Sequence, residues 1–188
     1  MLSRATQVTY AVLFGAATLV ALTGPRTSAV DDARIERGRY IVTAFACGDC
    51  HTPKKFGPDG PQEDATRLLS GHPHDVVLPP APVLPAGPWI ATCNDMLTAW
   101  SGPWGTCFPA NLTPDVETGL GSWKEEDFLA AIRTGRHMGR GRPILPPMPV
   151  QAIANMTDED LRSVFAYLRS IPAIKNAVPE PLPPPSAR

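Results

Sequence analysis

Three segments of the chain carry apolar residues at the spacing of an α-helix. The first begins at Asp31 or Asp32, either of which can cap a helix, and runs to about Ala46. Its small and apolar positions recur three or four residues apart, at Ile35, Gly38, Val42 and Phe45. Residues at this spacing share one face of a helix, so the pattern predicts an amphipathic helix.

The two later segments also carry start and stop signals. The residues from Ser122 to Glu125 have the form of a capping box, and Gly135 is a helix stop. Thr157 with Asp160 opens the last segment, and Pro172 forbids its continuation. The apolar positions are Phe128, Leu129 and Ile132 in the second segment and Leu161, Val164, Phe165 and Leu168 in the third. No stretch alternates convincingly with period two, so the sequence predicts an all-α domain with long loops.

The chain contains 23 prolines, and they concentrate in an insert at about 58–109 and in a tail at 176–188. The tail segment from Pro179 to Pro185 is expected to form extended, solvated polyproline II. A structureless insert of this length is unusual inside a compact domain. A buried cofactor would explain it, because short helices and proline-stiffened loops can wrap around such a body.

The first 29 residues have the layout of a secretory signal. Arg4 lies in a short basic start, an apolar run extends from Val8 to Leu22, and the small residues Thr27, Ser28 and Ala29 follow. Cleavage after Ala29 is the favoured prediction, and an uncleaved N-terminal membrane anchor is the alternative. The folded domain would follow this signal or anchor, at residues 31–175. The formal net charge of the chain is −1, which gives no reason to expect binding to nucleic acid.

Cys47, Gly48, Asp49, Cys50 and His51 form a C-x-x-C-H motif, which is the attachment signature of c-type haem. Two thiols on one turn can each bond a haem vinyl group, while the next residue offers its imidazole to the iron. A zinc site would need a second close cysteine pair, and a thioredoxin-type dithiol would need a βαβ context. Neither is present, so the motif predicts one covalently bound haem c.

Met148 is the favoured sixth ligand of the iron. It lies between Pro147 and Pro149 in a loop whose prolines restrict the backbone and can hold a thioether in place. Met138 is the main competitor, and His137 would give an iron with two histidine ligands. Two further histidines are expected to be surface loop residues rather than ligands, namely His72 and His74.

The order of helix, C-x-x-C-H motif, methionine loop and closing helix resembles class I cytochromes c. Within residues 31–172, four stretches look like the monohaem modules in cytochrome subunits of periplasmic alcohol, gluconate and aldehyde dehydrogenases. They are Asn111 to Asp115, Thr118 to Trp123, Pro147 to Pro149 and Thr157 to Leu161. The resemblance implies a cytochrome c-like fold with short helices around the haem. It also implies that Gly38 lets the first helix approach the last one closely, near Phe165 and Tyr167.

Several other side chains are candidates for the same site. Arg140, Arg142 and the indole N–H groups of Trp123 and Trp104 are candidate donors to a haem propionate, because a partly buried carboxylate needs donors. The remaining cysteines, Cys93 and Cys107, form an even pair in an oxidising compartment and are expected to form a disulfide. The alternative is that one of these two thiolates ligates the iron.

The sequence therefore predicts an electron carrier or an electron-transfer subunit of a dehydrogenase complex, and not an enzyme. It would carry electrons between a periplasmic dehydrogenase and the respiratory chain, through an oxidase or another cytochrome. It would be soluble in the bacterial periplasm or tethered to the inner membrane. The rival function is a haem enzyme or small-ligand sensor in which the sixth position of the iron is labile or occupied by thiolate.

Overall fold

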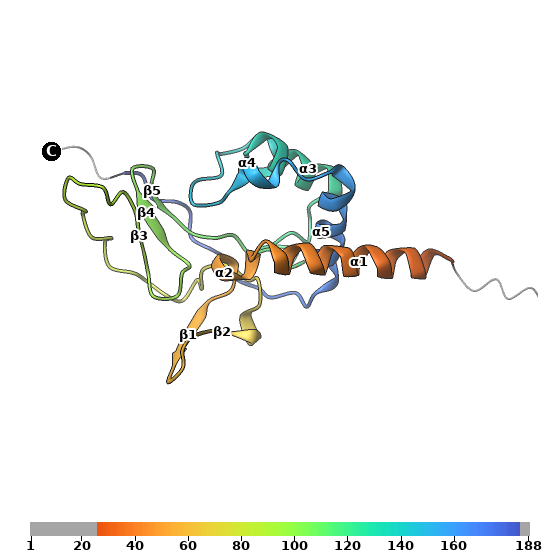
Figure 1. Cartoon of the computed structure of the whole chain (residues 1–188), viewed down its shortest axis with the longest axis horizontal. Helices are drawn as coiled ribbons and strands as arrows, with labels where there is room; N and C mark the ends of the chain where they lie inside the picture. The colour runs from red at the N-terminus through yellow and green to blue at the C-terminus, as the bar shows by residue number, and fades with distance from the viewer. Residues whose placement is uncertain (1–25, 185–188) are drawn as a thin grey trace, which may run out of the picture.

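The structure is a computed structural model that describes residues 26–184 (Figure 1). The apolar run from Val8 to Leu22, on which the predicted signal or anchor depends, lies outside the described residues. Within them, no helix is both long enough and apolar enough to cross a membrane.

The described residues form five α-helices, of which three were predicted from the pattern of apolar positions. They are α1 (Arg26–Ala44), α2 (Cys47–His51), α3 (Glu125–Thr134), α4 (Val150–Ile153) and α5 (Asp158–Ser170). Helix α5 begins as predicted, because the Thr157 hydroxyl accepts a hydrogen bond from the Asp160 backbone N–H at 3.1 Å. Helix α3 begins two residues later than expected, with Lys124 as its N-cap and Gly135 in a left-handed conformation at its end.

The all-α prediction is wrong, because the structure mixes helices with two antiparallel sheets. Strands β1 (Lys54–Gly57) and β2 (Gly60–Glu63) form a hairpin. Strands β3 (Thr92–Cys93), β4 (Trp100–Gly102) and β5 (Gly105–Cys107) form a second sheet in the order β3-β4-β5. Each strand has only two to four residues, too few to display an alternating pattern in the sequence. The second sheet falls wholly inside the insert that was expected to be loop, and the hairpin extends into its start.

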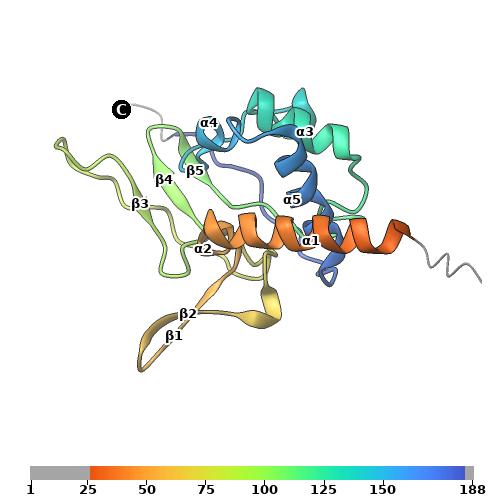
Figure 2. The ribbon, with the colours of Figure 1, turned by 45° about the vertical axis from the view of Figure 1, so that its right-hand side comes forward.

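Helices α1 and α5 cross in direct contact and form the centre of the core (Figures 1 and 2). A Cβ atom built on Gly38 would lie 1.9 Å from the backbone oxygen of Ser163 and 2.8 Å from the Cβ of Tyr167. The close approach that the resemblance implied for Gly38 is therefore confirmed. The core cluster consists of Ile41, Val42, Leu69, Leu120, Phe128, Ile132, Ile153, Leu161, Val164, Phe165 and Leu168.

In part of the insert that lies between the two sheets, every third residue is partly buried. Leu78, Ala81 and Leu84 are half-buried, whereas the residues between them are exposed. Polyproline II has three residues per turn, so this pattern is typical of an extended proline-rich segment that lays one face on the protein. The insert therefore covers part of the molecule without regular hydrogen bonding.

The segment that follows α5 packs against the insert. The backbone groups of Leu182 and Thr106 exchange two hydrogen bonds of 2.8 and 2.9 Å, which add the tail to the free edge of β5. Nearer to α5, the buried Asn176 side chain donates to the carbonyl oxygens of Ser70 and His72 at 2.7 and 2.8 Å. The tail therefore joins two parts of the insert that are distant in the sequence.

Candidate functional site

The C-x-x-C-H motif occupies a single helical turn, α2, directly after α1. The two helices are separated by a sharp bend at Ala46, whose φ of 51° is in the left-handed region. Backbone bonds from Asp49 to Ala46 and from Thr52 to Gly48 close the turn at 2.9 Å each. Both thiols and the imidazole are therefore held on one rigid turn, as a group bonded at three points would require.

His51 is oriented by a hydrogen bond to its ring. The side chain is 8% exposed, and its Nδ1 lies 2.8 Å from the carbonyl oxygen of Ala110. Burial lowers the pKa of His51, so the ring is neutral, Nδ1 donates its proton to Ala110, and Nε2 carries the free lone pair. A metal-binding histidine is held in this way, because the hydrogen bond on the other ring nitrogen fixes both the tautomer and the ring orientation.

The two cysteines of the motif are free thiols that favour the protonated form. Burial raises the pKa of the Cys47 thiol to about 11. The pKa of Cys50 is also raised, by burial and then by the carboxylate of Asp49. A catalytic dithiol or a zinc site needs thiolates, whose pKa is lowered. The raised pKa values do not fit a catalytic dithiol, and no group of three or more metal-binding His, Cys, Asp or Glu side chains occurs among the described residues.

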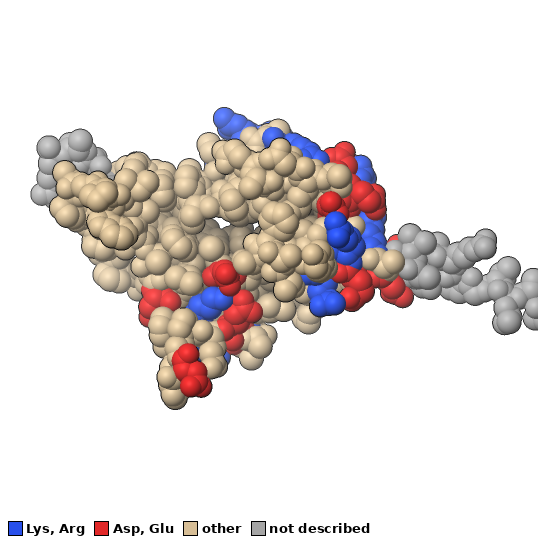
Figure 3. Space-filling view, in the orientation of Figure 1, with Lys and Arg blue, Asp and Glu red and all other residues tan. Residues whose placement is uncertain are grey.

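Met148 and Cys47 both pack against the same core cluster. Met148 lies just before α4 and is half-buried, with its carbonyl accepting from the Val150 N–H at 2.8 Å. Figure 3 shows an opening at the centre of the molecule, between α2 and the segment that leads into α4. Met138, the competing ligand, is not among the residues packed against that core and lies on a short 3-10 helix, His137–Gly139.

The two arginines among the predicted propionate donors pair with carboxylates of the chain. Arg140 faces Asp127 at 3.6 Å, and Arg142 pairs with Glu180 of the tail at 3.1 Å. Trp123 packs edge-on against the His137 ring with 4.9 Å between ring centroids. The indole nitrogen of Trp104, in contrast, is buried and makes no hydrogen bond of good geometry among the described residues, although it lies near the Cys107 thiol and lowers the pKa of that thiol. An orphaned buried donor of this kind fits a carboxylate of a bound group.

The disulfide predicted between Cys93 and Cys107 is not formed in this structure, where both residues are free thiols. Strand β4 stands between their strands, and Trp100 pairs with Cys93 on one side and with Cys107 on the other. Since neighbouring strands lie about 4.8 Å apart, two strand spacings exceed the separation that a disulfide spans.

His72 was expected at the surface, but it is only 1% exposed. Its Nδ1 lies 3.0 Å from the Thr98 hydroxyl and its Nε2 lies 3.1 Å from the Val76 carbonyl oxygen. Both ring nitrogens are engaged, so His72 links two parts of the insert, at Val76 and Thr98, and is not free to bind a metal. His74 is exposed, as expected, and contacts Asn176.

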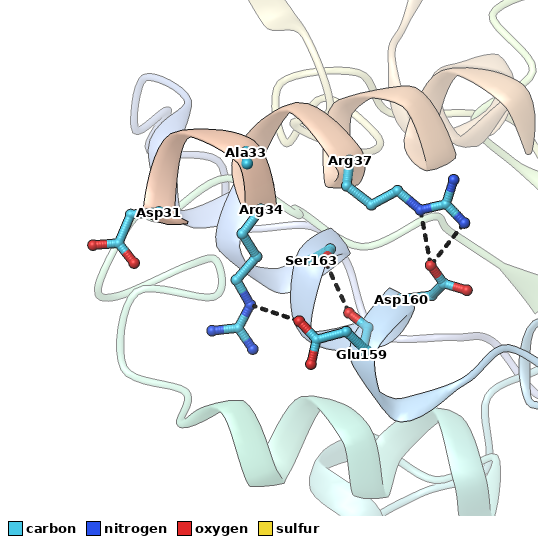
Figure 4. Close-up of a pocket in the computed structure, with 7 residues that line it drawn as sticks. All are labelled: Asp31, Ala33, Arg34, Arg37, Glu159, Asp160 and Ser163. Atoms are coloured by element: carbon cyan, nitrogen blue, oxygen red, sulfur yellow. Dashed lines mark hydrogen bonds and ion pairs between the residues drawn. The ribbon is translucent and has the colours of Figure 1, made fainter. Parts of the chain in front are cut away.

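A separate cavity lies between the N-terminal halves of α1 and α5 (Figure 4). Its charged side chains neutralise one another, because Arg37 pairs with Asp160 at 2.9 Å and Arg34 approaches Glu159 at 3.8 Å. The cavity is at the end of α1 away from the C-x-x-C-H turn and contains no residue predicted to be functional. These ion pairs fasten the two crossing helices together.

No family model matches the chain. Among curated proteins, it is 28% identical over 163 residues to a subunit of the nicotinate dehydrogenase of Pseudomonas putida, covering 87% of this chain and 11% of that protein. It is 29% identical over 157 residues to the cytochrome c subunit of alcohol dehydrogenase (quinone) of Gluconobacter oxydans, covering 84% and 24%. It is 30% identical over 137 residues to the gluconate 2-dehydrogenase cytochrome c subunit of Pantoea cypripedii, covering 73% and 23%.

The similarity spans most of this chain but only 11% to 24% of the length of these relatives. Those named as cytochrome c subunits are the electron-transfer subunits of their dehydrogenases, not the catalytic ones. The chain is thus similar, over most of its length, to parts of the cytochrome c subunits of bacterial dehydrogenases, which is consistent with a cytochrome c module.

Proposed function

We propose that the protein transfers electrons through one haem c, attached at Cys47 and Cys50 and ligated by His51 and Met148. The observation that carries the proposal is the geometry of α2. Two thiols and an imidazole share one turn, and the Ala110 carbonyl oxygen lies 2.8 Å from Nδ1 of His51, where it can accept a hydrogen bond from the ring. The sequence contains one C-x-x-C-H motif, which supports a single haem.

When bound, the haem supplies a one-electron couple between ferric and ferrous iron. The chain's own residues would set how that couple behaves. His51 keeps a proton on Nδ1 and shares it with Ala110, which makes Nε2 a stronger donor to a metal. Met148 offers a thioether, which favours the ferrous form relative to a nitrogen ligand. If His51 and Met148 both held the iron, no position on the metal would be left for a substrate.

The electron donor and acceptor would be other redox proteins of the bacterial periplasm. The support is that relatives of this chain are cytochrome c subunits of alcohol and gluconate dehydrogenases. A secretory signal in residues 1–29 would deliver the chain to that compartment, either free or tethered to the inner membrane. The protein would then accept electrons from a dehydrogenase and pass them to an oxidase or another cytochrome.

The proposal predicts that the haem stays on the polypeptide when the purified protein is extracted with acidified acetone. Two thioether bonds survive that treatment, whereas a haem held only by its axial ligands passes into the organic phase. Cys47→Ser and Cys50→Ser each remove one bond, and the double variant should release all of its haem. Haem released quantitatively from the unmodified protein would overturn the proposed attachment.

A further inference from the structure

The buried thiol of Cys107 donates a hydrogen bond to the loop that carries Met148. Cys107 ends strand β5 and is 8% exposed, and its Sγ lies 2.9 Å from the carbonyl oxygen of Pro146. Pro146 precedes Met148 by two residues in the sequence. The bond therefore joins the insert to the methionine loop, across 39 residues of sequence.

The methionine loop has few other attachments. The prolines at 143, 146, 147 and 149 have no backbone N–H, so this segment can donate few hydrogen bonds of its own. Among the described residues, Ile144 donates to the nearby Gly135 oxygen at 2.8 Å, and the other hydrogen bonds of residues 143–149 stay within the loop or run to the adjoining helix α4. The Cys107 thiol is thus the one described group that ties this stretch by a hydrogen bond to a distant part of the chain.

Strand β5, which supplies the Cys107 thiol, is hydrogen-bonded on both of its edges. It is paired with β4 on one side, and on the other its Thr106 exchanges two backbone hydrogen bonds with Leu182. A Cβ atom on Gly105 would lie 2.1 Å from the Leu182 oxygen, so the tail is seated closely against the strand. Burial raises the pKa of the Cys107 thiol, which keeps the S–H proton available for donation.

We propose that Cys107 is a positioning residue, whose thiol holds the Pro146 carbonyl and thereby keeps the Met148 thioether in place on the iron. The inference rests on the proposed haem ligation by Met148. In this view the sheet β3-β4-β5 and the tail after α5 act together, because they hold in place the loop that carries Met148. Loss of the thiol donor should leave the haem attached but make the methionine easier to displace.

Imidazole binding to the ferric protein measures this effect, because exogenous imidazole must displace the methionine before it reaches the iron. Cys107→Ala should bind imidazole about threefold more tightly, the size expected for one weak hydrogen bond. Cys107→Ser differs from Cys107→Ala by a hydroxyl donor and should return the affinity towards that of the unmodified protein. Cys93→Ala removes the other free thiol, on exposed β3, and should leave the affinity unchanged.

A double-mutant cycle separates positioning from general loosening of the structure. Met148→Ala should bind imidazole far more tightly, and adding Cys107→Ala to it should then have no further effect. If Met148→Ala leaves the affinity unchanged, the proposed ligation itself fails. If Met148→Ala behaves as expected but Cys107→Ala has no effect, or the same effect with and without Met148, the positioning role is wrong. A change in Cys93→Ala equal to that in Cys107→Ala would instead indicate a bond between the two thiols and would also overturn it.

Discussion

Replacing Gly38 with valine is expected to destabilise the folded protein by roughly 3 kcal/mol or more, because it forces overpacking where two helices touch. A Cβ atom at this position would lie 1.9 Å from the backbone oxygen of Ser163. That oxygen is in the middle of α5, so it cannot move away without distorting the helix. Helices α1 and α5 would have to separate, which would open the core around Val42 and Leu161. Urea unfolding of the haem-bound protein measures the loss.

Gly57→Val is the matched control for that substitution. Gly57 ends strand β1, and the nearest atom that its Cβ would meet is the Gly60 oxygen at 4.0 Å. Valine has room there and suits a strand, so the free energy of unfolding should change by no more than about 0.5 kcal/mol. Equal losses in the two variants would show that α1 and α5 do not cross as closely as the structure has them.

The parts of this fold that could be predicted from the sequence are those encoded locally. Helices α1, α3 and α5 have 19, 10 and 13 residues, which gives each room for apolar residues to recur at helical spacing. The strands, of two to four residues, are too short to display an alternating pattern. Their pairing depends on turns at Gly60 and Gly105, both with positive φ, and the Gly105 turn also depends on a tail more than 70 residues away.

The same distinction applies to the candidate site. The C-x-x-C-H motif is contiguous, so its two thiols and its imidazole could be named at once. The carbonyl that orients His51 belongs to Ala110, 59 residues away, and any residue type can supply a backbone oxygen. Cys107 was expected to pair with Cys93 because unpaired thiols are uncommon in exported proteins. The order of the strands, which places β4 between the two cysteines, and the contact of Cys107 with the Pro146 carbonyl oxygen both depend on the folded structure and are not encoded in the local sequence.

Replacing Met148 with alanine is expected to change the chemistry of the iron far more than the stability of the fold. The haem should remain attached, because Cys47, Cys50 and His51 are untouched. Losing the thioether removes the ligand that favours ferrous iron, so the reduction potential should fall by roughly 0.1 to 0.3 V, within the range of about 0.8 V that axial ligands span. The vacated position should also let carbon monoxide bind rapidly to the reduced protein. Potentiometric titration and optical spectra with carbon monoxide measure the two effects.

Met138→Ala is the control for Met148→Ala, since it removes the other candidate thioether from the distal side. Met138 lies on the 3-10 helix between α3 and the proline loop and is half-buried, as Met148 is. Its loss should leave the potential and the carbon monoxide response unchanged.

The resemblance to class I cytochromes also implies a weak near-infrared absorption in the ferric protein, which should disappear in Met148→Ala alone. If that absorption survives in Met148→Ala and is lost in Met138→Ala, the distal ligand is Met138, on the 3-10 helix His137–Gly139. Rapid carbon monoxide binding by the unmodified protein would instead favour a ligand sensor or a haem enzyme, because a carrier with both axial positions filled has no site for the gas.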